Sequence, residues 1–129
     1  MQNRTAMPFE FVADTTGFRA PDCHVIRLDG RLRRKRDLLR MLASKLRFPN
    51  YFGENWDALE ECLIDLTWLA PPHEVAIVHK YLPLMDSKQR AVYLDILKQT
   101  LAGGHRLRRV IFPLDAKDDV EQACQAAGQ

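Results

Sequence analysis

A continuous apolar run, Val75-Ala76-Ile77-Val78, constrains the fold of this chain more than any other feature. A strand without polar alternation is typical of a sheet that is covered on both faces, and such sheets are mostly parallel. Two further strands are predicted at residues 24–28 and 107–112, and segments with helical periodicity separate them from the central run. Strands that alternate with helices predict an α/β domain with a small three-stranded parallel sheet.

Four helices are predicted around that sheet, over about residues 37–46, 55–68, 86–102 and 117–127. Asn55 is a good N-cap for the second of them, and Gly103-Gly104 is a typical end for the third. The first 22 residues are expected to add one extended segment around residues 10–13.

Length, composition and cysteine usage favour a single domain inside the cell. A chain of 129 residues, 47% of them hydrophobic, can bury a core without covalent cross-links. Its three cysteines, Cys23, Cys62 and Cys124, include no Cys-x-x-Cys pair, so we expect free thiols in a reducing compartment. No signal peptide or membrane-spanning stretch is recognisable, and we therefore expect a cytoplasmic protein without a membrane partner.

The second predicted helix has an unusual charge pattern. Residues 48–72 contain no Lys or Arg and five acids: Glu54, Asp57, Glu60, Glu61 and Asp65. Asp57, Glu61 and Asp65 are spaced at i, i+4 and i+8, which places them on one helix face. Like charges at this spacing destabilise a helix by about 0.2–0.5 kcal/mol per pair. The helix dipole alone could explain Asp57, but the full row favours a positively charged partner.

The other side of the same helix is apolar and indicates a packed core. Its apolar stripe comprises Trp56, Leu59, Cys62, Leu63 and Leu66. Just before it, Gly53 can adopt the unusual backbone angles of a turn.

A long motif in this region carries a family resemblance. The run Phe48-Pro49-Asn50-Tyr51-Phe52-Gly53-Glu54-Asn55-Trp56-Asp57-Ala58-Leu59, followed by Glu61-Cys62-Leu63, closely resembles the hallmark segment of the barstar family. These proteins are intracellular inhibitors of the secreted ribonuclease barnase. The resemblance covers roughly residues 24–113 and implies a domain of that span. It leaves residues 1–23 as an N-terminal extension and residues 114–129 as a helical C-terminal extension.

The resemblance also implies roles for particular residues. In this family the acidic helix and the loop before it plug the nuclease active site, and one carboxylate replaces a substrate phosphate. Glu61 matches that carboxylate, Asp57 matches a second helix aspartate, and Tyr51 matches a loop aromatic that packs over a catalytic histidine. Cys62 matches a family cysteine that we interpret as core packing. The expected partner-binding residues are Tyr51, Phe52, Gly53, Glu54, Asn55, Asp57, Glu60, Glu61 and Asp65.

Departures from the family prototype at four positions indicate a different target. Glu60 stands where the prototype has a tryptophan, and Glu61 is one methylene longer than the prototype's aspartate. Two acids of a later helix fall on Gln99 and Gly103. We therefore expect the inhibitory helix to be kept, while the target is a ribonuclease other than barnase.

Patterns for catalysis and metal binding are scarce. The two serines lie outside a Gly-x-Ser-x-Gly elbow, and the four histidines match no metal-ligand spacing. Asp57, Glu60 and Glu61 could supply an acid–base pair, but an exposed helical ridge lacks the required pocket. We expect no enzymatic activity, no cofactor and no metal.

A basic run at residues 31–36 leaves one further alternative open. Five cations in six residues can bind phosphate, but no aromatic residues accompany the run in the sequence, and Asp29 and Asp37 flank it. Nucleic-acid binding is therefore the least favoured option. A basic edge opposite the acidic helix would make the protein dipolar and orient it towards a cationic partner.

The sequence thus predicts a cytoplasmic ribonuclease inhibitor that is monomeric before it binds its target. The alternative is a barstar-like interaction or immunity protein for a different basic partner or toxin.

Overall fold

The computed structural model of this protein describes residues 7–49, 53–84 and 86–127, with only the backbone of residues 126 and 127 described. In chain order the elements are β1 (Glu10–Val12), β2 (Cys23–Leu28), α1 (Lys35–Leu46), α2 (Trp56–Asp65), β3 (Glu74–His79), α3 (Ser87–Ala102), β4 (Leu107–Pro113), a short 3-10 helix η1 (Leu114–Ala116) and α4 (Lys117–Ala127). The predicted α/β class and its four helices are confirmed.

The strands form one parallel sheet in the order β1-β4-β3-β2. The sheet has four strands, so the predicted three-stranded sheet was one strand too small. The additional strand is β1, whose three residues pair with Ile111–Pro113 of β4. The sequence predicted an extended segment here. Its membership in the sheet depends on contacts with residues about one hundred positions later, which no local pattern reveals.

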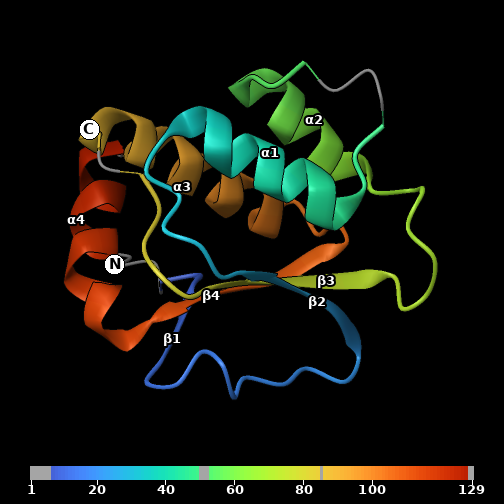
Figure 1. The fold of residues 1–129 in the computed structure, drawn as a ribbon, viewed down its shortest axis with the longest axis horizontal. Coiled ribbons are helices and arrows are strands. Elements are labelled where there is room, and N and C mark those ends of the chain that lie inside the picture. Colours follow the sequence, from blue (N-terminus) through green and yellow to red (C-terminus); the bar gives the residue numbers. More distant parts are fainter. Residues whose placement is uncertain (1–6, 50–52, 85, 128–129) are drawn as a thin grey trace, which may run out of the picture.

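Different layers cover the two faces of the sheet (Figure 1). Helices α1, α2 and α3 lie over one face, where Val75 and Ile77 join the main hydrophobic core. The segment between β1 and β2 passes under the other face, and there Ala76, Val78 and Phe18 pack together. The central apolar run is therefore buried on both sides, as predicted.

Long-range contacts tie the N-terminal segment to the sheet. Arg109 of β4 donates two hydrogen bonds, of 2.7 and 2.6 Å, to the carboxylate of Glu10 in β1. This guanidinium lowers the pKa of Glu10. The ring of the buried Phe9 packs edge-on against Phe112, with 5.4 Å between the ring centroids. Residues before the predicted domain thus belong to the same packed unit.

Helix α2 is shorter than predicted. It ends at Asp65, because the buried Leu66 takes a left-handed backbone conformation with φ of 48°. The amide of Leu66 donates to the carbonyl of Cys62, which closes the last turn. Trp68 was predicted to lie in this helix; it instead follows the turn and donates to the carbonyl of Leu46 at 2.9 Å.

Candidate functional site

The start of α2 is fixed by its own cap. The side-chain oxygen of Asn55 accepts a hydrogen bond from the amide of Ala58 at 2.8 Å, as the sequence predicted. Its amide group donates to the carbonyl of Gly53 at 3.4 Å. The loop that precedes the helix is therefore held by the same side chain that caps it.

The backbone strain in this loop falls on Glu54 rather than on Gly53. Glu54 has φ of 55°, in the left-handed region, where a residue with a side chain carries a conformational cost. A Cβ added at Gly53 would lie 3.1 Å from the side-chain nitrogen Nδ2 of Asn55, a tight contact that would require the capping side chain to shift. Glu54 also forms an exposed ion pair of 3.4 Å with Arg40 of α1.

Trp56 joins the first turn of α2 to α3. Its indole N–H donates to the side chain of Gln89 at 2.7 Å, and its ring stacks on Tyr93 with centroids 6.2 Å apart. Tyr93 is fully buried and in turn bonded to His79 of β3. The acidic helix is thus anchored through α3 to the centre of the sheet.

The predicted acidic row faces outward. Asp57, Glu61 and Asp65 are exposed, whereas Leu59 and Leu63 of the same helix are fully buried. Asp65 lies in the last turn of α2, which contains no basic residue. A carboxylate at a helix C-terminus is opposed by the helix dipole, at a cost of about 0.3–1 kcal/mol. Apart from Asp57, which lies in the first turn and is favoured by the dipole, the row gives the fold no stability that would explain it.

A groove of about 390 Å³ lies between α2 and α3, and we call it the acidic groove. Three carboxylates line it, those of Asp57 and Glu60 from α2 and that of Asp95 from α3. Its remaining lining is mostly apolar and comprises Trp56, Ala91, Val92 and Ile96. Such a groove can accept a basic side chain, because its walls fit an aliphatic stem and its carboxylates attract the charged end.

Asp95 was missed by the sequence reasoning. The family resemblance placed the acids of this region at Gln99 and Gly103, and neither residue is acidic here. Asp95 lies one helical turn before Gln99, and that spacing was the only signal that could have indicated it.

The other predicted site residues are distributed more widely. Asp65 lines a separate pocket of about 300 Å³ with His73 and His105, at the far end of α2. Glu61 does not line the acidic groove and stands exposed on the helix. Tyr51 and Phe52 lie outside the described residues.

The basic run ends beside the start of the acidic helix. The ammonium group of Lys35, at the start of α1, lies 5.3 Å from the ring centroid of Trp56. Because the first turns of α1 and α2 are neighbours, positive and negative surfaces adjoin one another.

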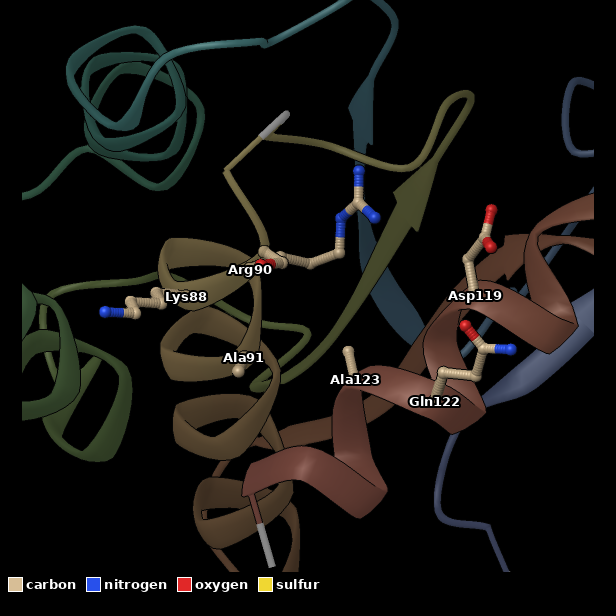
Figure 2. A pocket seen from close by; sticks show the side chains of 7 residues that line it. Lys88, Arg90, Ala91, Asp119, Gln122 and Ala123 are labelled. Atoms are coloured by element: carbon tan, nitrogen blue, oxygen red, sulfur yellow. The ribbon is translucent and has the colours of Figure 1, made fainter.

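A different pocket, of about 470 Å³, lies between α3 and α4 (Figure 2). Figure 2 shows Ala91 on α3 and Ala123 on α4, with Asp119 and Gln122 projecting from α4. Its single carboxylate is accompanied by cationic residues of α3, so this pocket lacks the acidic character of the groove.

The described residues contain no candidate metal cluster, no disulfide and no helix fit to cross a membrane. Within residues 7–49, 53–84 and 86–127, no group of three or more His, Cys, Asp or Glu could hold a metal ion. The three cysteines are free thiols, and burial raises the pKa of Cys62. None of the described helices has the length and apolar character needed to cross a membrane.

The chain is thus a parallel α/β domain with an outward-facing acidic helix and an acidic groove beside it. This chain belongs to the barstar family, since residues 23–113 match the family model described as Barstar (barnase inhibitor). Members of this family are inhibitors and not enzymes. Membership indicates an inhibitor of a barnase-type ribonuclease. No curated protein matches the chain.

Proposed function

We propose that this protein uses α2 and the loop before it to block the active site of a ribonuclease that it meets inside the cell. The observation that carries this proposal is the concentration of carboxylates that form no ion pair with any other described residue. Asp57, Glu60 and Asp95 meet in one groove, Glu61 is exposed on the same helix as two of them, and Asp65 is exposed at the far end of α2. A nuclease active site is built to hold phosphates among cationic residues, so a rigid array of carboxylates competes for the same contacts.

In this mechanism Glu61 takes the place of a substrate phosphate. Gly53, Glu54 and Asn55 shape the approach of the loop, together with Tyr51 and Phe52. The cap at Asn55 and the anchoring of Trp56 hold the carboxylates in place before binding, which reduces the conformational entropy lost in the complex.

The acidic groove extends the binding surface to α3. We place a Lys or Arg side chain of the nuclease in it, with its stem against Val92 and its charge among Asp57, Glu60 and Asp95. This assignment adds a second helix to the contact, although Gln99 and Gly103 carry no charge.

The protein would act as a monomer in the cytoplasm, where its free thiols remain reduced. A pull-down from lysate of the cells that make the protein, read by mass spectrometry, should recover a basic ribonuclease. Recovery of a basic partner without ribonuclease activity would instead favour the immunity or interaction protein that the sequence left as the alternative.

Glu61→Ala should weaken binding to that ribonuclease by about 2–5 kcal/mol, because a buried positive charge of the nuclease is left unpaired. That range already includes measurements on the barnase–barstar complex. Inhibition constants from a fluorogenic RNA cleavage assay test it, with Asp118→Ala, an exposed acid on α4, as the control. Stability should not fall, since a like-charged neighbour is removed. Unchanged binding per folded molecule would contradict the mechanism.

A further inference from the structure

Two loops at the carboxyl ends of β2 and β3 form a second charged surface, which we call the cationic surface. It comprises Arg31, Arg33, Lys80 and Tyr81. The loops are held together by a backbone hydrogen bond of 2.7 Å, from the amide of Leu84 to the carbonyl of Leu32. In open parallel sheets, the region just beyond the carboxyl ends of the strands is where ligands commonly bind.

The charges on this surface have no acidic partners in the described part of the chain. The ion pairs among the described residues involve Arg40, Arg108 and Arg109, and none of them involves Arg31, Arg33 or Lys80. The adjoining N-cap of α1, Arg34, makes no capping hydrogen bond with its side chain. Cations near a helix N-terminus are opposed by the dipole, so the fold gains little from this cluster.

The surface also contains cation–π contacts that the sequence did not indicate. The guanidinium carbon of Arg31 lies 4.0 Å from the ring centroid of Tyr81, and the ammonium group of Lys80 lies 5.6 Å from it. The absence of aromatic residues near the basic run had argued against nucleic-acid binding, and the fold removes that objection. Nucleic-acid bases stack on aromatic rings and on guanidinium planes alike.

A pocket of about 270 Å³ opens between the two loops, lined by Arg31, Arg33, Tyr81 and Arg90 among others. Arg90 is fixed in its wall, because its guanidinium donates to the carbonyls of Pro83 and Leu84. Arginine forks match phosphate oxygens through paired hydrogen bonds, and the pocket therefore suits a phosphate group.

We propose that the cationic surface binds single-stranded nucleic acid. Arg31, Arg33 and Lys80 contact the phosphate backbone, and one base stacks on the Arg31–Tyr81 pair. An acidic protein segment would satisfy the charges but would not use the ring of Tyr81 beside Arg31, so nucleic acid is the better match. This site is independent of nuclease inhibition, which uses the carboxylates of α2 and α3.

Fluorescence anisotropy of the full chain with labelled twelve-residue oligouridylate and oligodeoxythymidylate tests the proposal, across a salt series and without nuclease. Arg31→Ser with Arg33→Ser should weaken binding of at least one oligonucleotide tenfold or more at low salt. The affinity of this double variant should also depend less steeply on salt. Each phosphate contact to a single strand contributes about 0.7 to the slope of log affinity against log salt concentration. The matched control is Lys45→Ser with Arg108→Ser, which removes the same charge from exposed positions elsewhere. It should change affinity less than threefold.

A second pair of variants tests the stack. Tyr81→Phe should preserve binding, and Tyr81→Leu should weaken it about fivefold or more, since base stacking contributes on the order of 1–3 kcal/mol per base. Thermal unfolding of each variant confirms that it is folded. Three outcomes would overturn the proposal: no binding at low salt, equal losses in both double variants, or equally strong competition by polyglutamate, which would assign the surface to acidic proteins.

Discussion

Asp95 lies on α3, and its carboxylate faces the same groove as those of Asp57 and Glu60. Three carboxylates in one groove repel one another when no cation is bound, and they gain most when a desolvated cation enters. At the scale of single residues, we therefore expect the affinity of this surface to depend on a side chain outside the recognised motif.

Asp95→Asn should lower the affinity for the target ribonuclease about tenfold, equivalent to roughly 1.4 kcal/mol. Its free energy of unfolding should be unchanged or slightly higher, because repulsion within the groove is relieved. Isothermal titration calorimetry and urea unfolding measure the two effects, with Asp115→Asn as an exposed control outside the groove. Equal affinities of Asp95→Asn and the original protein would remove α3 from the interface.

His79 is another residue whose role depends on its surroundings. It is fully buried, with Nδ1 donating to the carbonyl of Ile111 at 3.0 Å and Nε2 accepting from the Tyr93 hydroxyl at 2.7 Å. The ring also stacks on Phe112, with centroids 4.1 Å apart. Both ring nitrogens are satisfied in the neutral form, and burial lowers the pKa of His79 from 6.5 to about 4.

This shift makes stability depend on pH. Between pH 6.5 and 4 the unfolded chain binds a proton at this histidine that the folded chain excludes, so stability falls as the pH is lowered through this window. The loss in the free energy of unfolding amounts to roughly 3 kcal/mol once the pH is below the window, and above pH 6.5 this histidine no longer makes stability depend on pH. His79→Gln should be less stable at pH 7 and should lose this part of the pH dependence. Urea unfolding of both proteins from pH 7 to 4 tests this, and parallel pH profiles would contradict it.

At the scale of elements, β1 shows how a segment with weak local signals becomes part of the sheet. Three residues give a strand little intrinsic stability. The pairing with β4, the Arg109–Glu10 contact and the packing of Phe9 on Phe112 determine its place. The segment that follows it then covers the second face of the sheet.

Phe9→Ala should lower the free energy of unfolding by about 3–5 kcal/mol, the usual cost of truncating a buried phenylalanine. Phe11→Ala should cost less, because Phe11 is only partly buried. Urea unfolding provides the measurement. Target binding by the folded fraction should be unchanged for both, and similar small losses for the two variants would mean that β1 is not integrated into the core.

At the scale of the whole molecule, positive and negative surfaces adjoin at the first turns of α1 and α2. A partner approaching α2 therefore meets Lys35 and Arg40 as well as the carboxylates, and this pattern can exclude partners whose rim is positive. Specificity among ribonucleases should follow from this adjoining of positive and negative surfaces, together with the differences from the family prototype at Glu60 and Glu61.

The protein should therefore inhibit barnase at least about 10³-fold less tightly than barstar does. Aromatic anchors and close charge pairs commonly account for more than 2 kcal/mol each, a range that includes measurements on barstar itself. Here Glu60 replaces an aromatic anchor and Gln99 an acid. Titration of barnase activity with both inhibitors measures the difference, and stoichiometric inhibition at nanomolar concentration would show that the substitutions are tolerated.

The sequence by itself determined the parallel α/β class, the positions of the main helices and strands, and the acidic row of α2. These features follow from local periodicity, capping and charge spacing, which act over a few neighbouring residues. Asn55 and the central strand at residues 75–78 are examples in which the local signal and the observed role agree.

The tertiary structure alone decided which distant side chains meet. It placed Asp95 beside Glu60, Tyr81 beside Arg31, and β1 beside β4. It also ended α2 at Asp65, where burial of Leu66 outweighed the helical pattern that continued to residue 68. Each of these outcomes depends on packing between elements, and contacts of that kind leave no periodic trace in a single sequence.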